Sequence, residues 1–486
     1  MDIRQPLLLL LAIAVPLLLF RLRRPDLVVG WIAITLTVHI FDTNLLTNLP
    51  AGRVVGLLYL PLALVRLQTW LRYRPVAAWV LNFGYLLLLG VIFGFLQPWP
   101  DVFGNRVWST TAPGRAIVYP VRLLADLSLM LFLAEQLCKP GMILFFGRSF
   151  IMGASMTAAM GFANLILPGF DPYNLITGEG YSGGIAFDRA RGLSFEPRGL
   201  GLACVYGLMI LLVYPGAVTR RRNFLMVITM LGLLSTYSTS ALAVAVVGIL
   251  TVWSFLSNRM RWNIGRALIV IPAVICLVAV TVPTQFQHGV NSISERTSTD
   301  RLQGAVARSL IEQVAWRLDV FDASSILFLG THPQYILTGT GPGEIMLAAS
   351  SSLPPGVYSL VFAQSGLNGV PSLGLLLEIC NSGLAGAFLW IVQVAYCRRA
   401  LSRLARAPSS LEGGDRSEEG TNRSEEWKFG FALFSIGAAI YLFQNSLEQP
   451  YWQSLLAVGW AAARTASEQQ RQTVPSEPAR IHPQPA

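Results

Sequence analysis

Charged side chains are scarce in this 486-residue chain: Lys, Arg, Asp and Glu make up 13% of it, whereas 53% of the residues are hydrophobic. Soluble domains are roughly one quarter charged, so this composition excludes an ordinary soluble protein. Apolar runs long enough to cross the ~30 Å hydrocarbon core of a bilayer recur along the sequence. The chain is therefore predicted to be an all-α polytopic membrane protein.

Histidine, cysteine and nucleotide-binding motifs are also sparse. The 4 histidines are scattered and show no metal-ligand spacing, so no metal is predicted. The 5 cysteines lie in or beside apolar runs, which implies no disulfide framework. The sequence has no glycine-rich ATP phosphate loop and no internal repeat of the kind found in many secondary transporters. No cofactor is predicted.

Positive charge is in excess, with a formal net charge of +10. Most of it lies at alternate ends of apolar runs, which is the positive-inside bias of membrane proteins and does not indicate a nucleic-acid partner. The predicted spans are 6–20, 27–48, 52–68, 76–97, 116–137, 142–168, 199–217, 223–237, 239–256, 267–283, 370–396, 429–447 and 449–464. Threading about 12 to 13 transmembrane helices in order puts the basic clusters on one side, with the N-terminus outside and the C-terminus inside. These clusters are 21–24, 66–74, 139, 220–222, 259–266 and 398–406.

Composition divides the chain into four parts. They are N-terminal transmembrane helices (1–283) with outer loops at 98–115 and 168–198, one large periplasmic loop (284–369), C-terminal transmembrane helices (370–464) with a cytoplasmic linker at 397–428, and a flexible cytoplasmic tail (465–486). Within the large loop, apolar residues recur every three to four positions from Leu302 to Phe321. This spacing predicts an amphipathic helix that lies on the membrane surface or caps the bundle.

Three arginines stand on the side of the membrane where the positive-inside bias disfavours them. Arg189, Arg191 and Arg198 precede the apolar run that begins at Gly199, in an outer loop. Pro197 is typical of a first helical turn, which places Glu196 and Arg198 at a helix N-terminus where exposed amides favour phosphate. Arginine adds a planar fork that matches phosphate oxygens. The alternative is a Glu196–Arg ion pair that only fixes the loop.

A second group of candidate residues lies further along the chain. Arg317 falls on the predicted amphipathic helix, where a lone arginine is more often simply solvated, and His332 precedes a run with glycines at 339, 341 and 343. Glycines at this spacing allow tight turns and close backbone approach. Polar residues inside predicted spans, such as Glu378, or Asp126 with Arg122 four positions earlier, are either interhelical locks or functional groups.

Taken in chain order, these elements resemble the O-antigen polymerase and O-antigen ligase superfamily of bacterial envelope glycosyltransferases. Arg191-Gly-Leu-Ser-Phe-Glu196-Pro197 is similar to a loosely spaced element at an outer helix start of that superfamily, and Ser235-Thr-Tyr-Ser-Thr-Ser240 is similar to its Ser/Thr-rich patch. Arg317 with Gly339-Thr-Gly341 resembles its large loop, and Glu378 with two later glycines resembles the span that follows. The resemblance covers most of the chain.

One departure bears on the activity. Ligases of this superfamily carry a histidine at the end of the large loop, where this chain has Gly369-Val-Pro-Ser372. The missing histidine favours a polymerase for O-antigen, exopolysaccharide or capsule. The resemblance then implies a multi-pass protein of the bacterial inner membrane that acts without a metal, an undecaprenyl-diphosphate-linked glycan as substrate, contact with membrane lipid, and a chain-length regulator as partner.

The residues receive roles within that reaction. Arg191, Arg198 and Arg317 are predicted to hold the diphosphate and stabilise the charge that develops as the glycosidic bond breaks. Diphosphate is a good leaving group, so no general acid is required, and Glu196 or His332 is the predicted base for the acceptor hydroxyl. The other predicted substrate-binding residues are Arg189, Gly339, Gly341 and Glu378.

Three other functions remain open at this point. A ligase would transfer the finished glycan to a lipid acceptor. A flippase or transporter of the same lipid-linked glycan would carry charge along a central path between spans, whereas the candidate residues gather in outer loops. A non-catalytic envelope assembly factor would tolerate single arginine substitutions.

Overall fold

The computed structural model describes residues 4–42, 50–99, 108, 111–167, 169–178, 190–194, 196–214, 219–255, 261, 280, 287, 320–350, 371–406, 418–444 and 451–473. Every regular element in these ranges is a helix. The elements in the N-terminal half are α1 (Arg4–Arg21), α2 (Pro25–Thr35), η1 (His39–Phe41), α3 (Ala51–Trp70), α4 (Arg74–Val91), η2 (Ile92–Leu96), α5 (Ala112–Leu137), α6 (Met142–Ile166), α7 (Pro172–Thr177), α8 (Pro197–Val213), α9 (Thr219–Ser235) and α10 (Thr239–Trp253). Those in the C-terminal half are α14 (Val320–Thr331), α15 (Gln334–Thr338), α16 (Ile345–Ser350), α18 (Gly374–Arg406), α19 (Glu418–Phe443) and α20 (Tyr451–Thr473).

Seven of the described helices are long and apolar enough to cross a membrane. They are Arg4–Arg21, Ala51–Trp70, Arg74–Leu96, Ala112–Leu137, Met142–Ile166, Gly374–Arg406 and Arg423–Phe443. Shorter apolar helices at Pro25–Thr35, Pro197–Val213, Ser240–Trp253 and Phe321–Thr331 accompany them. These helices confirm the prediction of an all-α, multi-pass membrane protein. The count of about 12 to 13 spans stays a prediction.

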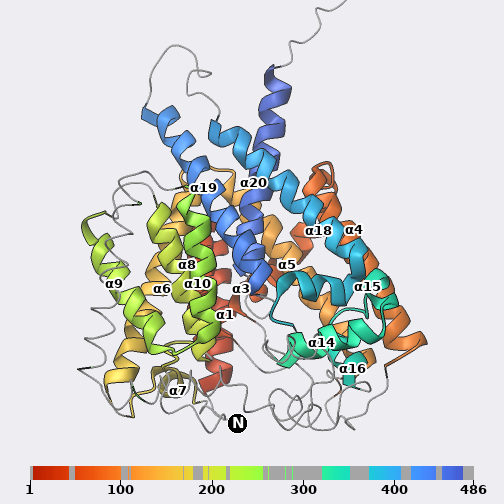
Figure 1. Ribbon diagram of the computed structural model, residues 1–486. Helices are drawn as coiled ribbons and strands as arrows, with labels where there is room; N and C mark the ends of the chain where they lie inside the picture. Colours follow the sequence, from red (N-terminus) through yellow and green to blue (C-terminus); the bar gives the residue numbers. More distant parts are fainter. Residues whose placement is uncertain are drawn as a thin grey trace, which may run out of the picture.

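The helices run roughly up and down between two ends of the bundle (Figure 1). The N-terminus, α7 and α14–α16 lie at one end, here called the outer end, and the projecting ends of α18, α19 and α20 lie at the other, here called the basic end. Two side-chain contacts lie at that second end, beside residues of predicted basic clusters: Arg74 Nη1 donates to Tyr396 Oη at 2.7 Å, and Arg423 Nη2 to the Cys138 carbonyl at 2.7 Å. The predicted threading through the membrane stays a prediction.

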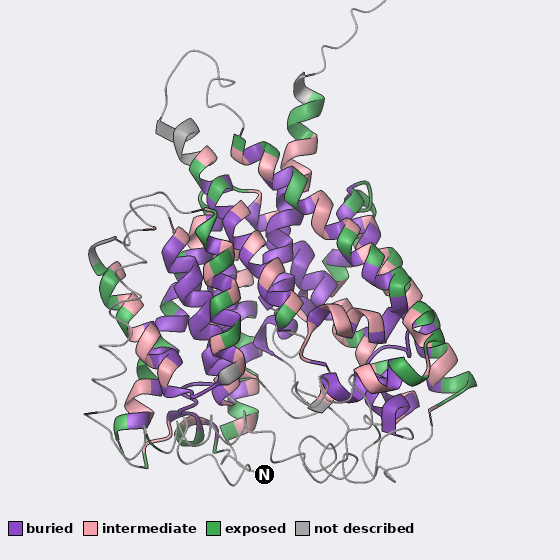
Figure 2. Ribbon diagram, viewed as in Figure 1, coloured by how far each residue is buried: buried purple, intermediate pink, exposed green. Residues whose placement is uncertain are grey.

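Burial separates central from peripheral helices (Figure 2). The apolar window of α6 is 67% buried inside the protein, whereas that of α1 is 17% buried and that of Arg74–Leu96 is 28% buried. Exposed residues follow the outward sides of α4 and α9 in Figure 2. The exposed side of α4 carries Leu81, Leu87, Leu88 and Val91, and that of α9 carries Phe224 and Val227, which are side chains suited to contact with lipid tails rather than with water.

One predicted span is interrupted. The sequence predicts a single span over 27–48, but α2 ends at Thr35. The hydroxyls of Thr35 and Thr37 donate to carbonyls three residues earlier, at 3.1 and 2.8 Å, and compete with continuation of the helix. The His39 amide then donates to the Leu193 carbonyl at 3.0 Å. The chain leaves the helix here because it binds the segment that carries Arg191.

A buried ion pair joins α3 to α5. Arg53 Nε lies 2.9 Å from Asp126 Oδ1 and Arg53 Nη2 lies 3.1 Å from Oδ2, with 2% and 1% of the two side chains exposed. Gly56, one turn later on α3, lets the helices approach, since an added Cβ would lie 2.1 Å from the Ala125 carbonyl oxygen. The sequence suggested Arg122 as the partner of Asp126, and the structure adds this two-pronged ion pair with Arg53.

Breaking the pair from one side is expected to destabilise the bundle. Arg53→Leu leaves a buried carboxylate without its counter-charge, at an expected loss of about 3 kcal/mol or more. The double variant Arg53→Leu/Asp126→Leu is expected to recover much of that loss, because neither charge remains buried. Thermal unfolding of purified protein in detergent measures both effects.

The matched control is Arg24→Leu, which breaks an exposed ion pair with Asp26. It is expected to leave the unfolding temperature unchanged. An Arg53→Leu protein that unfolds at the wild-type temperature would contradict a structural role for the buried pair.

Candidate functional site

The segment 190–194 is fixed by backbone contacts to three other elements. The Ala190 amide donates to the Ser235 carbonyl at 3.1 Å, which brings the Arg191–Pro197 motif against the Ser/Thr-rich turn 235–240. Gly192 has φ +56, and an added Cβ there would lie 2.5 Å from the Thr157 carbonyl oxygen of α6. Only glycine fits this close approach.

The Arg191 side chain is buried, with 4% exposed. Its Nε lies 3.1 and 3.0 Å from the two carboxylate oxygens of Asp171, and its Cζ lies 4.8 Å from the centroid of the Tyr173 ring. This ion-pair partner therefore sits at the start of α7. The contact holds the described segment 190–194 against α7. A direct contact between Arg191 and phosphate stays a prediction.

Glu196 and Arg198 flank the start of α8, as the proline indicated. Glu196 has the extended backbone of an N-cap residue, and its side chain forms no capping hydrogen bond. Both side chains are half-buried. Arg198 Nη2 donates to Ser372 Oγ at 3.0 Å, two residues before α18 begins. Arg189 lies outside the described residues.

The glycine run packs on a break in α18. Gly383 has φ +62, a left-handed conformation that interrupts the helix and frees the carbonyls before it. The Thr340 amide donates to the Cys380 carbonyl at 2.7 Å, and the Gly341 amide donates to the Asn381 carbonyl at 3.2 Å. The loop 339–343 therefore satisfies carbonyls that a continuous helix would have used itself.

Close approach explains the glycines of this loop. Gly339 and Gly341 have φ +79 and +96, and an added Cβ at Gly339 would lie 2.6 Å from the Asn381 carbonyl oxygen. The Gly343 amide donates to Asn381 Oδ1 at 3.0 Å, and Asn381 Nδ2 donates to the Tyr119 hydroxyl at 3.0 Å. In this structure the glycine run binds α18, and a contact with substrate stays a prediction.

A polar cavity of about 60 Å³ lies beneath this loop, between α4, α5, α18, α19 and α20. Glu378 lines it and accepts a hydrogen bond from the Tyr441 hydroxyl at 2.8 Å. Four buried polar atoms of the lining residues have no partner among the described residues: Asn82 Oδ1, Trp390 Nε1, Gln393 Nε2 and Gln453 Oε1. The set combines donors and acceptors, which water satisfies and a lone cation or anion does not.

Glu344, which the sequence did not single out, follows the glycine run directly. Its side chain is fully buried, and neither carboxylate oxygen has a hydrogen-bond partner among the described residues. Burial raises the pKa of Glu344 to about 8, although the charge of Arg115 opposes the shift. Arg115 Nη1 donates to the Gly343 carbonyl. The only signal in the sequence was an acidic residue next to three spaced glycines.

His332 belongs to an aromatic cluster at the outer end. Its ring stacks on Phe328 with centroids 4.7 Å apart, and its Nδ1 lies 2.9 Å from Thr331 Oγ1. Tyr335 packs on the other side of the cluster, 5.3 Å from Trp99. The environment of the His332 ring is therefore aromatic and close to the surface. Arg317 and most of the predicted amphipathic helix lie outside the described residues.

Apart from His332, the predicted site residues that the structure describes fall into two groups. One is built on α7 and the start of α8 and holds Arg191, Glu196 and Arg198, and the other is built on α18 and holds the glycines and Glu378. The Arg198–Ser372 hydrogen bond joins them. Across the described ranges, no group of three or more His, Cys, Asp or Glu side chains is placed to hold a metal ion.

Comparison of the sequence with models of protein families gives no match, and comparison with curated proteins gives none either.

The buried Glu344 carboxylate predicts a pH dependence of stability. Its pKa is raised on folding from 4.5 to about 8, so the stability that this residue contributes is complete below pH 4.5 and is lost as the pH rises to about 8. The slope is at most roughly 1.4 kcal/mol per pH unit. Glu344→Gln is expected to flatten the fall in unfolding temperature across this window.

The control is Glu425→Gln, at a side chain that is 55% exposed in a pair with Lys428. It should keep the wild-type pH profile. If Glu344→Gln also keeps that profile, Glu344 is not a buried titrating group.

Proposed function

We propose that this protein is a membrane-embedded polysaccharide polymerase that joins lipid-diphosphate-linked glycan repeat units at its outer end. The observation that carries the proposal is the hydrogen bond between Arg198 and Ser372, 174 positions apart in the chain. It brings a half-buried arginine at a helix N-terminus beside the first turn of α18. The hydrogen bond thereby joins the residue that follows the Arg191–Pro197 element to the start of the span that carries Glu378.

The start of α8 suits a diphosphate. Its first amides and the positive end of its dipole favour an anion. Arg198 adds a charged planar fork at a half-buried position. The proposal also includes the predicted 12 to 13 spans and the large loop 284–369 at this end, which would cover the substrate.

The chemistry is a transfer between two carrier-linked glycans. The acceptor hydroxyl attacks the anomeric carbon of the donor, the bond to the diphosphate breaks, and the lipid diphosphate leaves with its negative charge. Arg198, together with Arg189 and Arg317, stabilises that charge. Glu196, two residues before Arg198, is the favoured acceptor of the hydroxyl proton, with His332 as the alternative.

Arg191 takes a positioning role in this proposal. Its ion pair with Asp171 and its stacking on Tyr173 hold segment 190–194 against α6 and the turn at Ser235. That segment leads directly into Glu196 and Arg198. Loss of the pair would displace both residues from the helix start.

A flippase or transporter of the same glycan is less well supported. The polar cavity beneath the glycine run measures about 60 Å³, whereas pockets for small ligands usually measure about 300 Å³ or more. A sugar unit does not fit there. A larger cavity of about 340 Å³ at the basic end holds none of the candidate site residues. The missing histidine in Gly369–Ser372 continues to favour polymerase over ligase.

Arg198→Ala is expected to lower polymer formation on the order of 10²-fold, because it removes a charge-stabilising donor. The measurement is a joint profile of surface and carrier-linked glycans in the host, in which single exported repeat units should accumulate. Arg221→Ala, at an exposed arginine at the start of α9, beyond the opposite end of α8 from Arg198, is the matched control and should leave the profile unchanged.

Deletion of the gene separates the rival functions in the same assay. Unlengthened, exported repeat units support the polymerase. Long chains left on the lipid carrier indicate a ligase, repeat units confined to the inner face indicate a flippase, and an unchanged profile rules out all three.

A further inference from the structure

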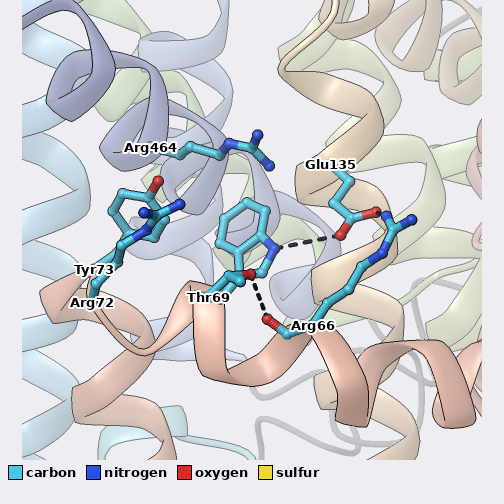
Figure 3. Close-up of a pocket in the computed structure, with 7 residues that line it drawn as sticks. Arg66, Thr69, Arg72, Tyr73, Glu135 and Arg464 are labelled. Atoms are coloured by element: carbon cyan, nitrogen blue, oxygen red, sulfur yellow. Dashed lines mark hydrogen bonds and ion pairs between the residues drawn. The ribbon is translucent and has the colours of Figure 1, made fainter.

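A second cavity of about 340 Å³ opens at the basic end, away from the proposed polymerase site. The ends of α3, α5 and α20 and the turn between α3 and α4 surround it (Figure 3). The residues that matter for its chemistry are Arg66, Trp70, Arg72, Tyr73, Glu135 and Arg464.

Its single carboxylate is already neutralised. Glu135 forms an ion pair with Arg66 and accepts hydrogen bonds from the Tyr59 hydroxyl at 2.6 Å and from Trp70 Nε1 at 3.4 Å. Arg66 and Glu135 therefore balance each other, and the remaining charge in the cavity lining comes from Arg72 and from Arg464, which also pairs with the half-exposed Glu468 outside the lining. An anion entering the cavity meets a net positive surface.

The two remaining arginines are held in place by aromatic rings. Arg464 Cζ lies 5.3 Å from the Trp70 ring centroid, and Arg72 Cζ lies 5.3 Å from that of Tyr73. Stacking orients a guanidinium but uses none of its N–H groups. Among the described residues, Arg464 donates a hydrogen bond only from Nε, to Glu468 Oε1 at 2.9 Å. Its terminal nitrogens are therefore available to a ligand. In Figure 3 this guanidinium extends between Tyr73 and Glu135.

An apolar surface continues from the cavity along α3. Leu62 and Val65, within one turn of Arg66, are 53% and 78% exposed. On a membrane-spanning helix such side chains face acyl chains. The charged cavity thus sits where a phospholipid would place its headgroup, directly above a surface suited to its tails.

We propose that this cavity binds the phosphodiester headgroup of an anionic phospholipid. The positive-inside rule assigns the basic end to the cytoplasmic leaflet, where anionic lipids present negative charge and where basic pockets between helices bind phosphorylated headgroups. Trp70 and Tyr73 are the residue types found at the headgroup level. A soluble phosphate would use the same arginines but not the apolar surface on α3.

A lipid bound here would bridge α20 to the α3–α4 turn. Arg464 comes from α20 and Arg72 from the turn, so one phosphate that contacts both adds a connection between them. The bound lipid is therefore expected to stabilise the folded chain.

The test uses the full-length protein in a zwitterionic detergent, with bound lipid measured by native mass spectrometry and unfolding by a thermal ramp. Added phosphatidylglycerol is expected to be retained and to raise the unfolding temperature, whereas phosphatidylcholine does neither. Arg464→Gln/Arg72→Gln should weaken retention at least tenfold. Arg403→Gln, an exposed arginine of α18 near the same end, removes charge outside the cavity and should not.

Two outcomes would overturn the proposal. Equal loss in the Arg403 control would mean diffuse attraction to basic surface, and equal stabilisation by inorganic phosphate would mean a site for a free anion. Unfolding of the variants without lipid is measured in parallel, so that a folding defect is recognised. Arg464→Lys/Arg72→Lys, which keeps the charge but loses the planar stacking, should retain the lipid only partly.

Discussion

The break in α18 at Gly383 is the constraint on which the outer end depends. Backbone carbonyls inside a membrane protein must find donors within the protein, because lipid offers none. The left-handed residue frees the carbonyls of Cys380 and Asn381, and the loop 339–343 supplies amides to them at 2.7 and 3.2 Å. The outer loop and the helix therefore hold each other in place.

The same first turns of α18 connect distant parts of the chain. Asp322 of α14 accepts from the Leu373 amide at 3.1 Å, Ser372 accepts from Arg198 of α8, and Tyr441 of α19 donates to Glu378. Asn381 reaches Tyr119 of α5. The start of α18 is therefore bound to the loop 339–343 and to α5, α14 and α19, and α18 residues line the polar cavity. A ligand at the start of α8 would act on α18 through the Arg198–Ser372 hydrogen bond.

Local patterns in the sequence were sufficient for the long apolar helices that the structure describes. Hydropathy located the long spans, and Pro197 marked the start of α8, since both signals arise from residues within a few positions of each other. The predicted 27–48 span was wrong in its second half because the competing contact, at Leu193, lies far along the chain. The hydroxyls of Thr35 and Thr37 bind backbone carbonyls of the same segment and compete with the helix, an effect that hydropathy does not measure.

The site was less predictable because its partners are distant in sequence. Arg191 and Asp171 are 20 positions apart, and Arg53 and Asp126 are 73 positions apart. Neither pair has the three- or four-residue spacing by which a sequence indicates a contact on one helix. Glu344 was not among the predicted site residues, because its burial arises from packing against the rest of the protein. Arg189 and Arg317 lie outside the described residues, and their predicted roles stay predictions.

The most direct test of glycosyl transfer is reconstitution. Purified protein in vesicles receives a lipid-diphosphate-linked repeat unit as the only glycan, and both glycan length and released lipid diphosphate are followed with time. The account predicts chains of two and more repeat units, with one lipid diphosphate released for each new linkage. Substrate that stays at single-unit length, with no release of lipid diphosphate by a folded protein, would contradict it.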